Sequence, residues 1–315
     1  MPSHGFVRVA AAVPRVHVAQ PRRNVDEMRP MIEQAHAEGV QILCFPELGI
    51  TGYTCGDLFL QQELLLQAND ALKYLLTMLR GKDMIVIVGM PIAVNGQRYN
   101  VAVVCNGSRP IGVVPKIYIP NYREFQERRW YSSGSSLKGQ SVIIADQLVW
   151  SGTDLLFDLS AVIPDCIFAV EICEDLWIPI PPSCFSAIYG ATIQFNPSAS
   201  DAVVGKAEYR RDLLVAGQSG RCVSSYVYVS SSSCIRGGGE STAEFVHDGH
   251  IIIAENGSVL AESERFSTEP QLIIRDIDIG RLMHDRLVMG TFGQCRDENP
   301  RHMRRVPCAV KELSL

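Results

Sequence analysis

Metal-site and disulfide patterns are missing from this sequence. None of its ten cysteines forms a CxxC pair, and its seven histidines include no HExxH motif. Ten cysteines in 315 residues are also far fewer than a disulfide scaffold requires. We therefore expect no bound metal ion and mostly buried, reduced thiols, of which one can be reactive.

Long apolar runs and an excess of positive charge are also missing. The longest nearly apolar stretch, residues 84–94, is shorter than the ~20 residues that span a bilayer, and the N-terminal region lacks a continuous signal-peptide core. With 29 Lys and Arg against 34 Asp and Glu, the net charge of −5 argues against nucleic acid or a membrane as the main partner. We expect a soluble, cytoplasmic protein that recognises a small molecule or another protein.

The remaining composition is that of an ordinary globular protein, with 47% hydrophobic and 20% charged residues. A chain of this length is as readily one large domain as two, and we find neither an internal repeat nor a dividing linker. The segment after residue 292 is basic, and we interpret it as a solvated tail or as a docking segment for another domain or subunit. Its arginines are Arg296, Arg301, Arg304 and Arg305.

Helical patterns alternate with short apolar runs. Residues 24–39 predict a helix, because Asn24 and Glu27 fit a capping box and Gly39 can end it. Pro30 is too late for the favoured first-turn position, so it moves the expected start further along the chain. Further helices are expected at residues 61–79, 182–189 and 208–222.

Many short strands are expected, several of them joined by tight turns. Asn95-Gly96, Asn106-Gly107 and Asn256-Gly257 each separate two strand-like runs, which is typical of antiparallel hairpins. Asp248-Gly249, between two histidines, is interpreted as one more hairpin turn. Strands are expected at residues 40–47, 84–94, 97–106, 109–116, 167–173, 192–196, 226–231 and 271–279. This mixture favours packed sheets with helices outside over a purely parallel sheet.

Three apolar strands end in chemically reactive side chains. These are Glu47 in FPELGITGY, Lys116 in VVPKIYIPNYREF and Cys173 in VEICEDLW. In layered α/β proteins, functional sites gather at such strand ends. An acyl-transfer site needs these three groups: a thiolate that attacks, a carboxylate that takes its proton and later activates water, and an ammonium that favours the thiolate and stabilises an oxyanion.

Each of these residues alone has an ordinary structural explanation. A Cys at a strand end is usually a small core residue, and a Glu or Lys after Pro usually lies in a loop. Cys173 differs from the other cysteines because Glu171, Glu174 and Asp175 crowd it. Such a concentration of carboxylates beside a thiol is unfavourable unless a cation such as Lys116 lies nearby.

In order and context the three residues resemble the Glu-Lys-Cys triad of the nitrilase, or carbon–nitrogen hydrolase, superfamily. Within it, the chain from about His4 to Phe292 resembles the glutaminase domain of glutamine-dependent NAD synthetases. The segments that carry this resemblance are HGFVRVA, FPELGITGY, GVVPKIYIPNYREFQERRW, VEICEDLWIPIPPS, GKAEYRR, RCVSSYVY, GESTAEFVHDGH and AENGSVLAESERF. It implies an αββα sandwich, with residues 1–292 as the amidohydrolase domain and residues 293–315 as a basic tail or linker.

The resemblance also implies roles for individual residues. Cys173 corresponds to the nucleophile, Glu47 to the general base, and Lys116 to the cation that stabilises the tetrahedral intermediate. The positions that correspond to substrate-binding residues are Tyr122, Glu124, Glu174, Ser198, Ser200 and Lys206. Among them, Glu124 matches the further carboxylate that the superfamily places beside the triad.

The implied reaction is hydrolysis of L-glutamine to glutamate and ammonia through a Cys173 thioester, with the ammonia used to amidate deamido-NAD. No cofactor is expected for this step. ATP and deamido-NAD would bind only to a synthetase domain or subunit, because the chain lacks both the SGGxDS loop and the GxxxxGK[ST] motif. A homo-oligomer is also expected. Two alternatives stay open: a stand-alone amidase that acts on another ω-amide or carbamoyl compound, and a weakly active interaction subunit of a synthetase.

Overall fold

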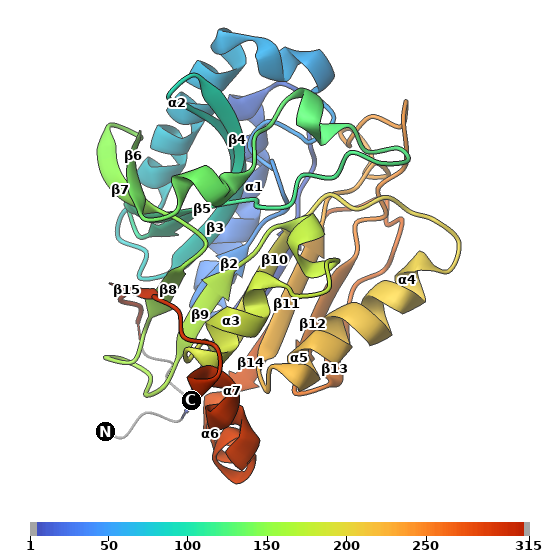
Figure 1. The fold of residues 1–315 in the computed structure, drawn as a ribbon. Coiled ribbons are helices and arrows are strands. Elements are labelled where there is room, and N and C mark those ends of the chain that lie inside the picture. Colours follow the sequence, from blue (N-terminus) through green and yellow to red (C-terminus); the bar gives the residue numbers. More distant parts are fainter. Residues whose placement is uncertain (1–4, 312–315) are drawn as a thin grey trace.

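Two β-sheets form the centre of the molecule in a computed structural model that describes residues 5–311 (Figure 1). The first sheet has the strand order β14-β1-β2-β3-β4-β5-β7-β6, and the second has the order β13-β12-β11-β10-β9-β8-β15. The strands of the first sheet are β1 (Phe6–Val13), β2 (Ile42–Cys44), β3 (Ile85–Val94), β4 (Gln97–Asn106), β5 (Arg109–Pro115), β6 (Gln140–Ile144), β7 (Gln147–Ser151) and β14 (Gln271–Asp278). Those of the second are β8 (Leu155–Asp158), β9 (Ile167–Val170), β10 (Ile193–Ser198), β11 (Ser225–Ser230), β12 (Ile251–Glu255), β13 (Ser258–Glu262) and β15 (Arg304–Pro307).

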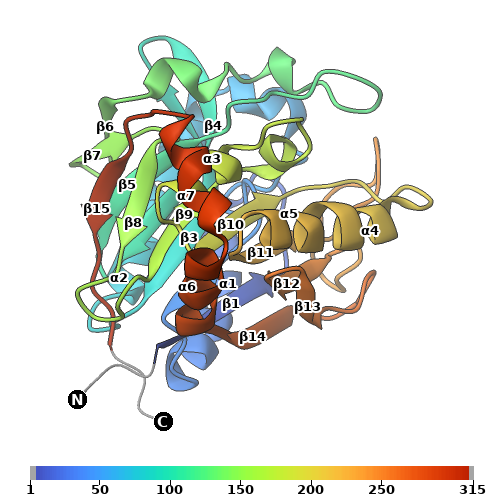
Figure 2. The same ribbon diagram turned by 60° about the horizontal axis from the view of Figure 1, so that its bottom comes forward.

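Helices cover the outer faces of both sheets (Figures 1 and 2). The helices are α1 (Pro21–Ala37), α2 (Gln62–Met78), α3 (Pro182–Ile188), α4 (Lys206–Glu208), α5 (Gly217–Arg221), α6 (Ile279–Val288) and α7 (Gly290–Asp297). A π-helical stretch, Tyr209–Ala216, joins α4 to α5. Within residues 5–311, no helix combines the length and the apolar character that crossing a bilayer would need.

The residues of β1 show how the sequence builds these layers. Val7, Val9 and Ala11 are buried in the core between the two sheets, whereas Ala10 and Ala12 are buried in a second core beneath α1 and α2. Alternate side chains of a strand point to opposite faces of its sheet, so a strand that is apolar on both faces needs a cover on each side. The expected αββα arrangement is therefore confirmed.

Helix α1 begins earlier than its sequence pattern predicts. Pro21 occupies the first turn, where a missing N–H causes no loss. Asn24 is not a cap: its buried side chain accepts a hydrogen bond from the backbone N–H of His17 and donates to the carbonyls of His17 and Ile50. The predicted capping box is wrong because this side chain anchors a loop instead. Pro30 lies inside the helix but on its exposed face, where water can hydrate the carbonyl that its ring leaves unpaired.

The Asn-Gly turns behave as predicted, but the Asp-Gly turn does not. Asn95-Gly96, Asn106-Gly107 and Asn256-Gly257 join antiparallel strand pairs. Asp248-Gly249 joins no such pair, and instead Asp248 forms a single bridge with Ser232. Asp248 is buried and paired with the Arg210 guanidinium, so this turn belongs to an interior polar cluster.

The basic C-terminal segment is part of the fold through residue 311. The expected boundary at residue 292 falls within α7, and β15 pairs in parallel with β8 at the edge of the second sheet. Val306, Cys308 and Val310 are buried in the core between the sheets. The prediction of a solvated tail is therefore wrong for residues 304–311, where β15 and these apolar side chains complete that core, whereas Arg296, Arg301 and Arg305 are exposed. Residues 312–315 lie outside the described part, and a linker toward another domain stays a prediction.

Candidate active site

Glu47, Lys116 and Cys173 lie at the ends of three strands from both sheets. Glu47 follows β2, Lys116 follows β5, and Cys173 follows β9. The backbone N–H of Glu47 donates to the carbonyl of Ser198 at 3.3 Å, which joins the end of β2 to β10 in the other sheet. The Asp175 carboxylate joins the other two ends, because it accepts hydrogen bonds from the backbone of Ile117, Tyr118 and Ile172 at 3.2, 2.9 and 3.1 Å.

A buried ion pair connects Lys116 to Glu47. The Lys116 Nζ atom lies 2.7 Å from Glu47 Oε1, and both side chains are fully buried. The Asn100 amide donates to the same oxygen at 2.6 Å. The second oxygen, Oε2, is buried and has no hydrogen-bond partner among residues 5–311. Glu47 is thus held through one oxygen and keeps the other free to accept a proton.

A second carboxylate, Glu127, contacts Lys116. Its two oxygens lie 2.7 and 2.9 Å from Lys116 Nζ, and Oε1 also accepts the Tyr53 hydroxyl at 2.9 Å. The prediction that Glu124 takes this position is wrong. Glu124 lies on the wall of a pocket instead, since the turn at residues 122–125 directs it outward before Glu127 turns in. Glu127 was missed because its segment, QERRW, is strongly polar and gives no sign of burial.

Cys173 opens a 3-10 turn, Cys173–Leu176, with a left-handed φ of 44°. This conformation is uncommon for a non-glycine residue and is often found at functional sites. The side chain is 5% exposed. Burial raises the pKa of its thiol, and Glu47 and Glu127 raise it further, against the lowering effect of Lys116. Lys116 thus favours the thiolate as the sequence predicts, but burial and the two carboxylates outweigh it. The thiol is neutral, and its proton must leave as the sulfur reacts.

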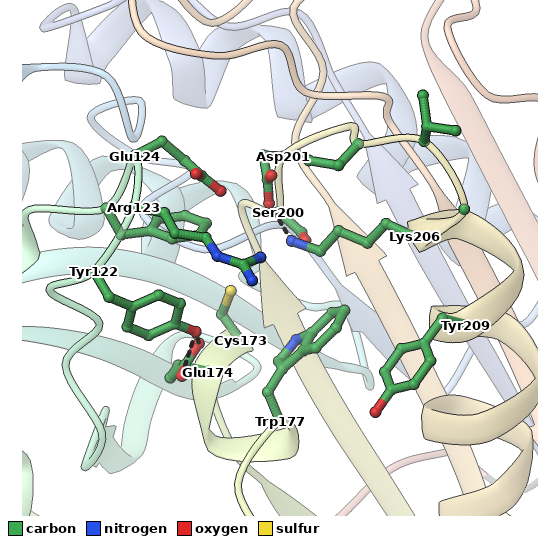
Figure 3. Close-up of a pocket in the computed structure, with 14 residues that line it drawn as sticks. Tyr122, Arg123, Glu124, Cys173, Glu174, Trp177, Ser200, Asp201, Lys206 and Tyr209 are labelled. Atoms are coloured by element: carbon green, nitrogen blue, oxygen red, sulfur yellow. Dashed lines mark hydrogen bonds and ion pairs between the residues drawn. The ribbon is translucent and has the colours of Figure 1, made fainter.

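Cys173 reaches a cavity of about 350 Å³ (Figure 3). This volume is within the range of ~300–1,000 Å³ that is typical of small-molecule sites. Tyr122 and Glu174 form one wall, where the Tyr122 hydroxyl donates to the two carboxylate oxygens of Glu174 at 2.8 and 3.0 Å. Trp177 and Tyr209 form another wall, with their rings stacked at a centroid distance of 5.9 Å.

Two cations and several acceptors line this cavity. Lys206 forms an ion pair with Asp201, and its ammonium lies 4.7 Å from the centre of the Trp177 ring. The Arg123 guanidinium points into the cavity in front of Cys173 (Figure 3). In the described part of the chain it forms no ion pair. Positive and negative groups that face one small cavity suit a zwitterionic ligand.

The structure separates the two predicted serines. Ser200 lines the cavity, whereas Ser198 does not, because its hydroxyl donates to Asn196 Oδ1 at 2.6 Å and its carbonyl accepts the Glu47 N–H. Ser198 therefore positions the loop that carries Glu47. Of the six predicted substrate-binding residues, the cavity brings together Tyr122, Glu124, Glu174, Ser200 and Lys206.

A fully buried arginine supports the far wall of the cavity. The Arg210 guanidinium donates to the Asp248 carboxylate at 2.9 Å, to the Ser200 hydroxyl at 3.2 Å and to the Asp201 carbonyl at 3.1 Å. Sequence reasoning missed this residue, as it missed Arg123, Trp177 and Asp201. Arg210 lies on the π-helical stretch, a form that is rare and frequent near functional sites.

This arrangement can carry out acyl transfer. A thiol lies beside a carboxylate that can take its proton, and a buried ammonium can stabilise negative charge on a carbonyl oxygen. In the described residues, no three His, Cys, Asp or Glu side chains are grouped to hold a metal ion. The fold and these groups define a cysteine hydrolase of the sandwich type.

Comparison with known proteins identifies the family. The family model described as carbon-nitrogen hydrolase matches residues 8–286, so the chain belongs to this family. A glutamine-dependent NAD(+) synthetase from Mycobacterium tuberculosis is 41% identical over 310 residues, which are 98% of this chain and 44% of that protein. The homologous protein from Mycobacterium leprae is 38% identical, over 93% of this chain and 42% of its own length. The chain thus spans less than half of these curated relatives.

Solved structures give the same result for the fold. The glutamine-dependent NAD(+) synthetase from Cytophaga hutchinsonii superposes with a TM-score of 0.75 at 29% identity, over 86% of this chain and 43% of that chain. An amidase from Nesterenkonia sp. superposes with a TM-score of 0.67 at 17% identity, over 92% of this chain and 97% of that chain. The second comparison supports the sandwich fold alone.

Proposed function

We propose that the chain is a glutamine amidohydrolase that supplies ammonia for the amidation of deamido-NAD. The observation that carries this proposal is the Cys173 thiol, which lines a cavity that holds both cations and acceptors, with the Glu47 carboxylate, held through one oxygen, and the Lys116 ammonium buried behind it. The similarity to glutamine-dependent NAD(+) synthetases supports glutamine as the substrate.

In this proposal Glu47 transfers two protons in turn, the first from the thiol to ammonia and the second from water to the thiol. The Cys173 sulfur attacks the side-chain amide carbon of glutamine while Glu47 Oε2 takes the thiol proton. Lys116 and the backbone N–H of Glu174, at the start of the 3-10 turn, stabilise the oxyanion. Glu47 then gives the proton to the departing ammonia, which leaves a thioester. Glu47 next deprotonates a water molecule, whose attack on the thioester releases glutamate, and Glu47 returns that proton to the Cys173 sulfur. No cofactor enters these steps.

Recognition of the free amino acid follows from the charges of the cavity. The α-carboxylate pairs with Lys206 and Arg123, and the α-ammonium is bound by acceptors such as Glu174 and Asp201. Lys206 has a carboxylate partner already, whereas Arg123 is free to meet the substrate. These assignments distinguish an amino-acid amide from a simple aliphatic amide, which carries neither charge.

Glutamate release from glutamine tests the proposal, with Cys173→Ala as the inactive variant. The thiol is small and buried, so we expect this variant to fold and to release no glutamate above background. Butyramide serves as the uncharged comparison substrate. Equal rates on glutamine and butyramide would instead favour the stand-alone amidase, and full activity of Cys173→Ala would contradict any thioester mechanism.

The partner and the assembly state belong to the same proposal. We infer a synthetase domain or subunit as the recipient of ammonia, with ATP and deamido-NAD bound there, and a cytoplasmic homo-oligomer as the working form. Adding a synthetase with its two substrates should raise glutamate release. Light scattering after size-exclusion chromatography measures the assembly state, and a monomer at micromolar concentration would contradict the oligomer.

A further inference from the structure

Two cysteines outside the active site share one hydrogen-bond donor. Cys184 lies on α3 and Cys222 directly follows α5. The Gln218 amide nitrogen lies 3.2 Å from the Cys184 sulfur and 3.3 Å from the Cys222 sulfur. The orientation of this amide is fixed, because Arg221 donates to its oxygen at 3.1 Å. One small group therefore holds both sulfurs close together, although α3 and α5 are far apart in sequence.

The two sulfurs also contact each other, and their environments differ. The Cys222 thiol donates to the backbone carbonyl of Ser183 at 3.6 Å, and the Cys184 and Cys222 side chains are close enough to shift each other's pKa. Interaction with Cys222, together with Gln218 and Arg221, lowers the pKa of Cys184, whereas interaction with Cys184 and burial raise the pKa of Cys222. Cys184 is partly exposed, and Cys222 is buried behind it. A partly exposed thiolate next to a buried thiol is the usual arrangement of an attacking and a resolving cysteine.

We propose that Cys184 and Cys222 form a redox-active dithiol site, which reacts with low-molecular-weight disulfides to give an intramolecular Cys184–Cys222 disulfide. In the first step the Cys184 sulfur attacks one sulfur of the small disulfide. The bond between the two small sulfurs breaks, one thiolate leaves and takes up a proton, and a mixed disulfide remains on Cys184. Cys222 then loses its proton and attacks the Cys184 sulfur, releasing the second small thiol. Two electrons and two protons pass from the protein to the small disulfide.

The other cysteines compare unfavourably with this pair. Cys173 is buried, and burial raises its thiol pKa, so it reacts slowly without its substrate. Cys234 is similar to Cys184 in its partial exposure, but burial raises its pKa and no second thiol contacts it within residues 5–311. Cys295 is exposed and serves as a reference for simple access. The pair therefore combines activation, access and a neighbouring thiol.

The test treats the whole reduced chain with glutathione disulfide, followed by acid quenching, alkylation and peptide mass spectrometry. We expect the Cys184–Cys222 disulfide to form at least about tenfold faster than glutathione adds to Cys234 or Cys295. Cys222→Ser should accumulate a stable glutathione adduct on Cys184, and Cys184→Ser should leave Cys222 reduced. The matched control, Cys234→Ser, should form the disulfide at the unaltered rate.

A second measurement needs no substitution. In the native chain, iodoacetamide should alkylate Cys184 at least about tenfold faster than Cys234 at neutral pH, because only Cys184 is substantially ionised there. The proposal is overturned if Cys295 and Cys234 acquire glutathione while Cys184 and Cys222 stay reduced, or if Cys222→Ser folds and forms no adduct on Cys184. Neither measurement depends on glutaminase activity, so the Cys173→Ala chain gives the same answer.

Discussion

Replacing Glu127 with Gln tests how the site handles its buried charges. In the resting site the Lys116 ammonium contacts two carboxylates, Glu47 and Glu127, at 2.7 Å each. When Glu47 takes the thiol proton, it loses its charge, and Glu127 alone then balances the fully buried Lys116. Glu127→Gln preserves the size of the side chain and a hydrogen-bond acceptor but removes this second charge. Each proton transfer to Glu47 would then leave the ammonium without a carboxylate partner and with only the transient substrate oxyanion nearby.

The expected size of the effect follows from the loss of that carboxylate partner. Removing one partner of a buried ion pair costs about 3–5 kcal/mol. Here the cost arises on the path to the thioester rather than in the resting state, where Glu47 still pairs with Lys116. Because each 1.36 kcal/mol changes a rate tenfold, we expect kcat to fall by about a hundred- to several thousandfold. The KM for glutamine should change by less than about threefold, since Glu127 does not line the cavity.

Steady-state glutamate release and single-turnover thioester formation measure this prediction, and thermal unfolding checks that the variant is folded. Glu124→Gln is the matched control, because Glu124 lies on the cavity wall and does not contact Lys116. It should act mainly on KM. A folded Glu127→Gln protein that retains kcat within threefold would refute this charge argument, as would a larger kcat loss in Glu124→Gln.

Three further predictions concern the loop of Glu47, stability at acid pH and substrate recognition. Gly89→Ala should abolish activity and lower the free energy of unfolding by about 1–3 kcal/mol, because the new Cβ would lie 2.2 Å from the Leu48 nitrogen. Glutamate release and urea unfolding measure the two effects. The control is Gly293→Ala, whose new Cβ meets nothing within 4 Å and should change neither. Burial lowers the pKa of His247 to about 4, whereas its pKa in the unfolded chain is about 6.5. Between these two pH values the unfolded state binds a proton that the folded state does not, so stability is lost as the pH falls. From pH 7 to pH 5 the free energy of unfolding should therefore fall by about 2 kcal/mol more in the wild type than in His247→Gln. Urea unfolding at several pH values measures this, and the same pH dependence in both proteins would refute it. Lys206→Met and Arg123→Met should each raise KM for glutamine about tenfold or more through a lost charge-assisted hydrogen bond, while turnover of butyramide stays within about threefold.

The periodic and turn-forming parts of the sequence predicted the fold well. Helix α2 and the hairpins at Asn95-Gly96 and Asn256-Gly257 are confirmed because local backbone preferences decide them. The start of α1 and the turn at Asp248 were wrong for one shared reason. In both places a polar side chain that suits a local cap or turn instead satisfies distant partners: loop carbonyls for Asn24, and the Arg210 guanidinium for Asp248. Such tertiary use leaves no periodic signal.

The residues of the candidate site show the same difference between local patterns and tertiary contacts. Glu47, Lys116 and Cys173 follow apolar strands, so their segments pointed to one edge of the sandwich, and the structure brings them together there. Glu127 lies in a polar segment whose burial depends on Lys116, a residue from a different part of the chain. A buried charge is stable only beside its partner, so neither residue alone predicts its environment. The same applies to Arg210, whose full burial follows from Asp248 and Ser200.

The neutral state of Cys173 explains why the cluster contains two carboxylates and one ammonium. A resting thiolate would add a third negative charge beside Glu47 and Glu127, and burial would make that state unfavourable. With the thiol neutral, Lys116 faces two carboxylates. Burial and the charge of Glu47 raise the pKa of Glu127 to about 7, and the negative charge of Glu47 resides on the base that must accept the proton. Attack on a carbonyl then moves that charge through the sulfur onto the substrate oxygen, while Lys116 keeps Glu127 as its partner throughout. The buried ammonium therefore meets a balancing charge at every step of the proposed reaction.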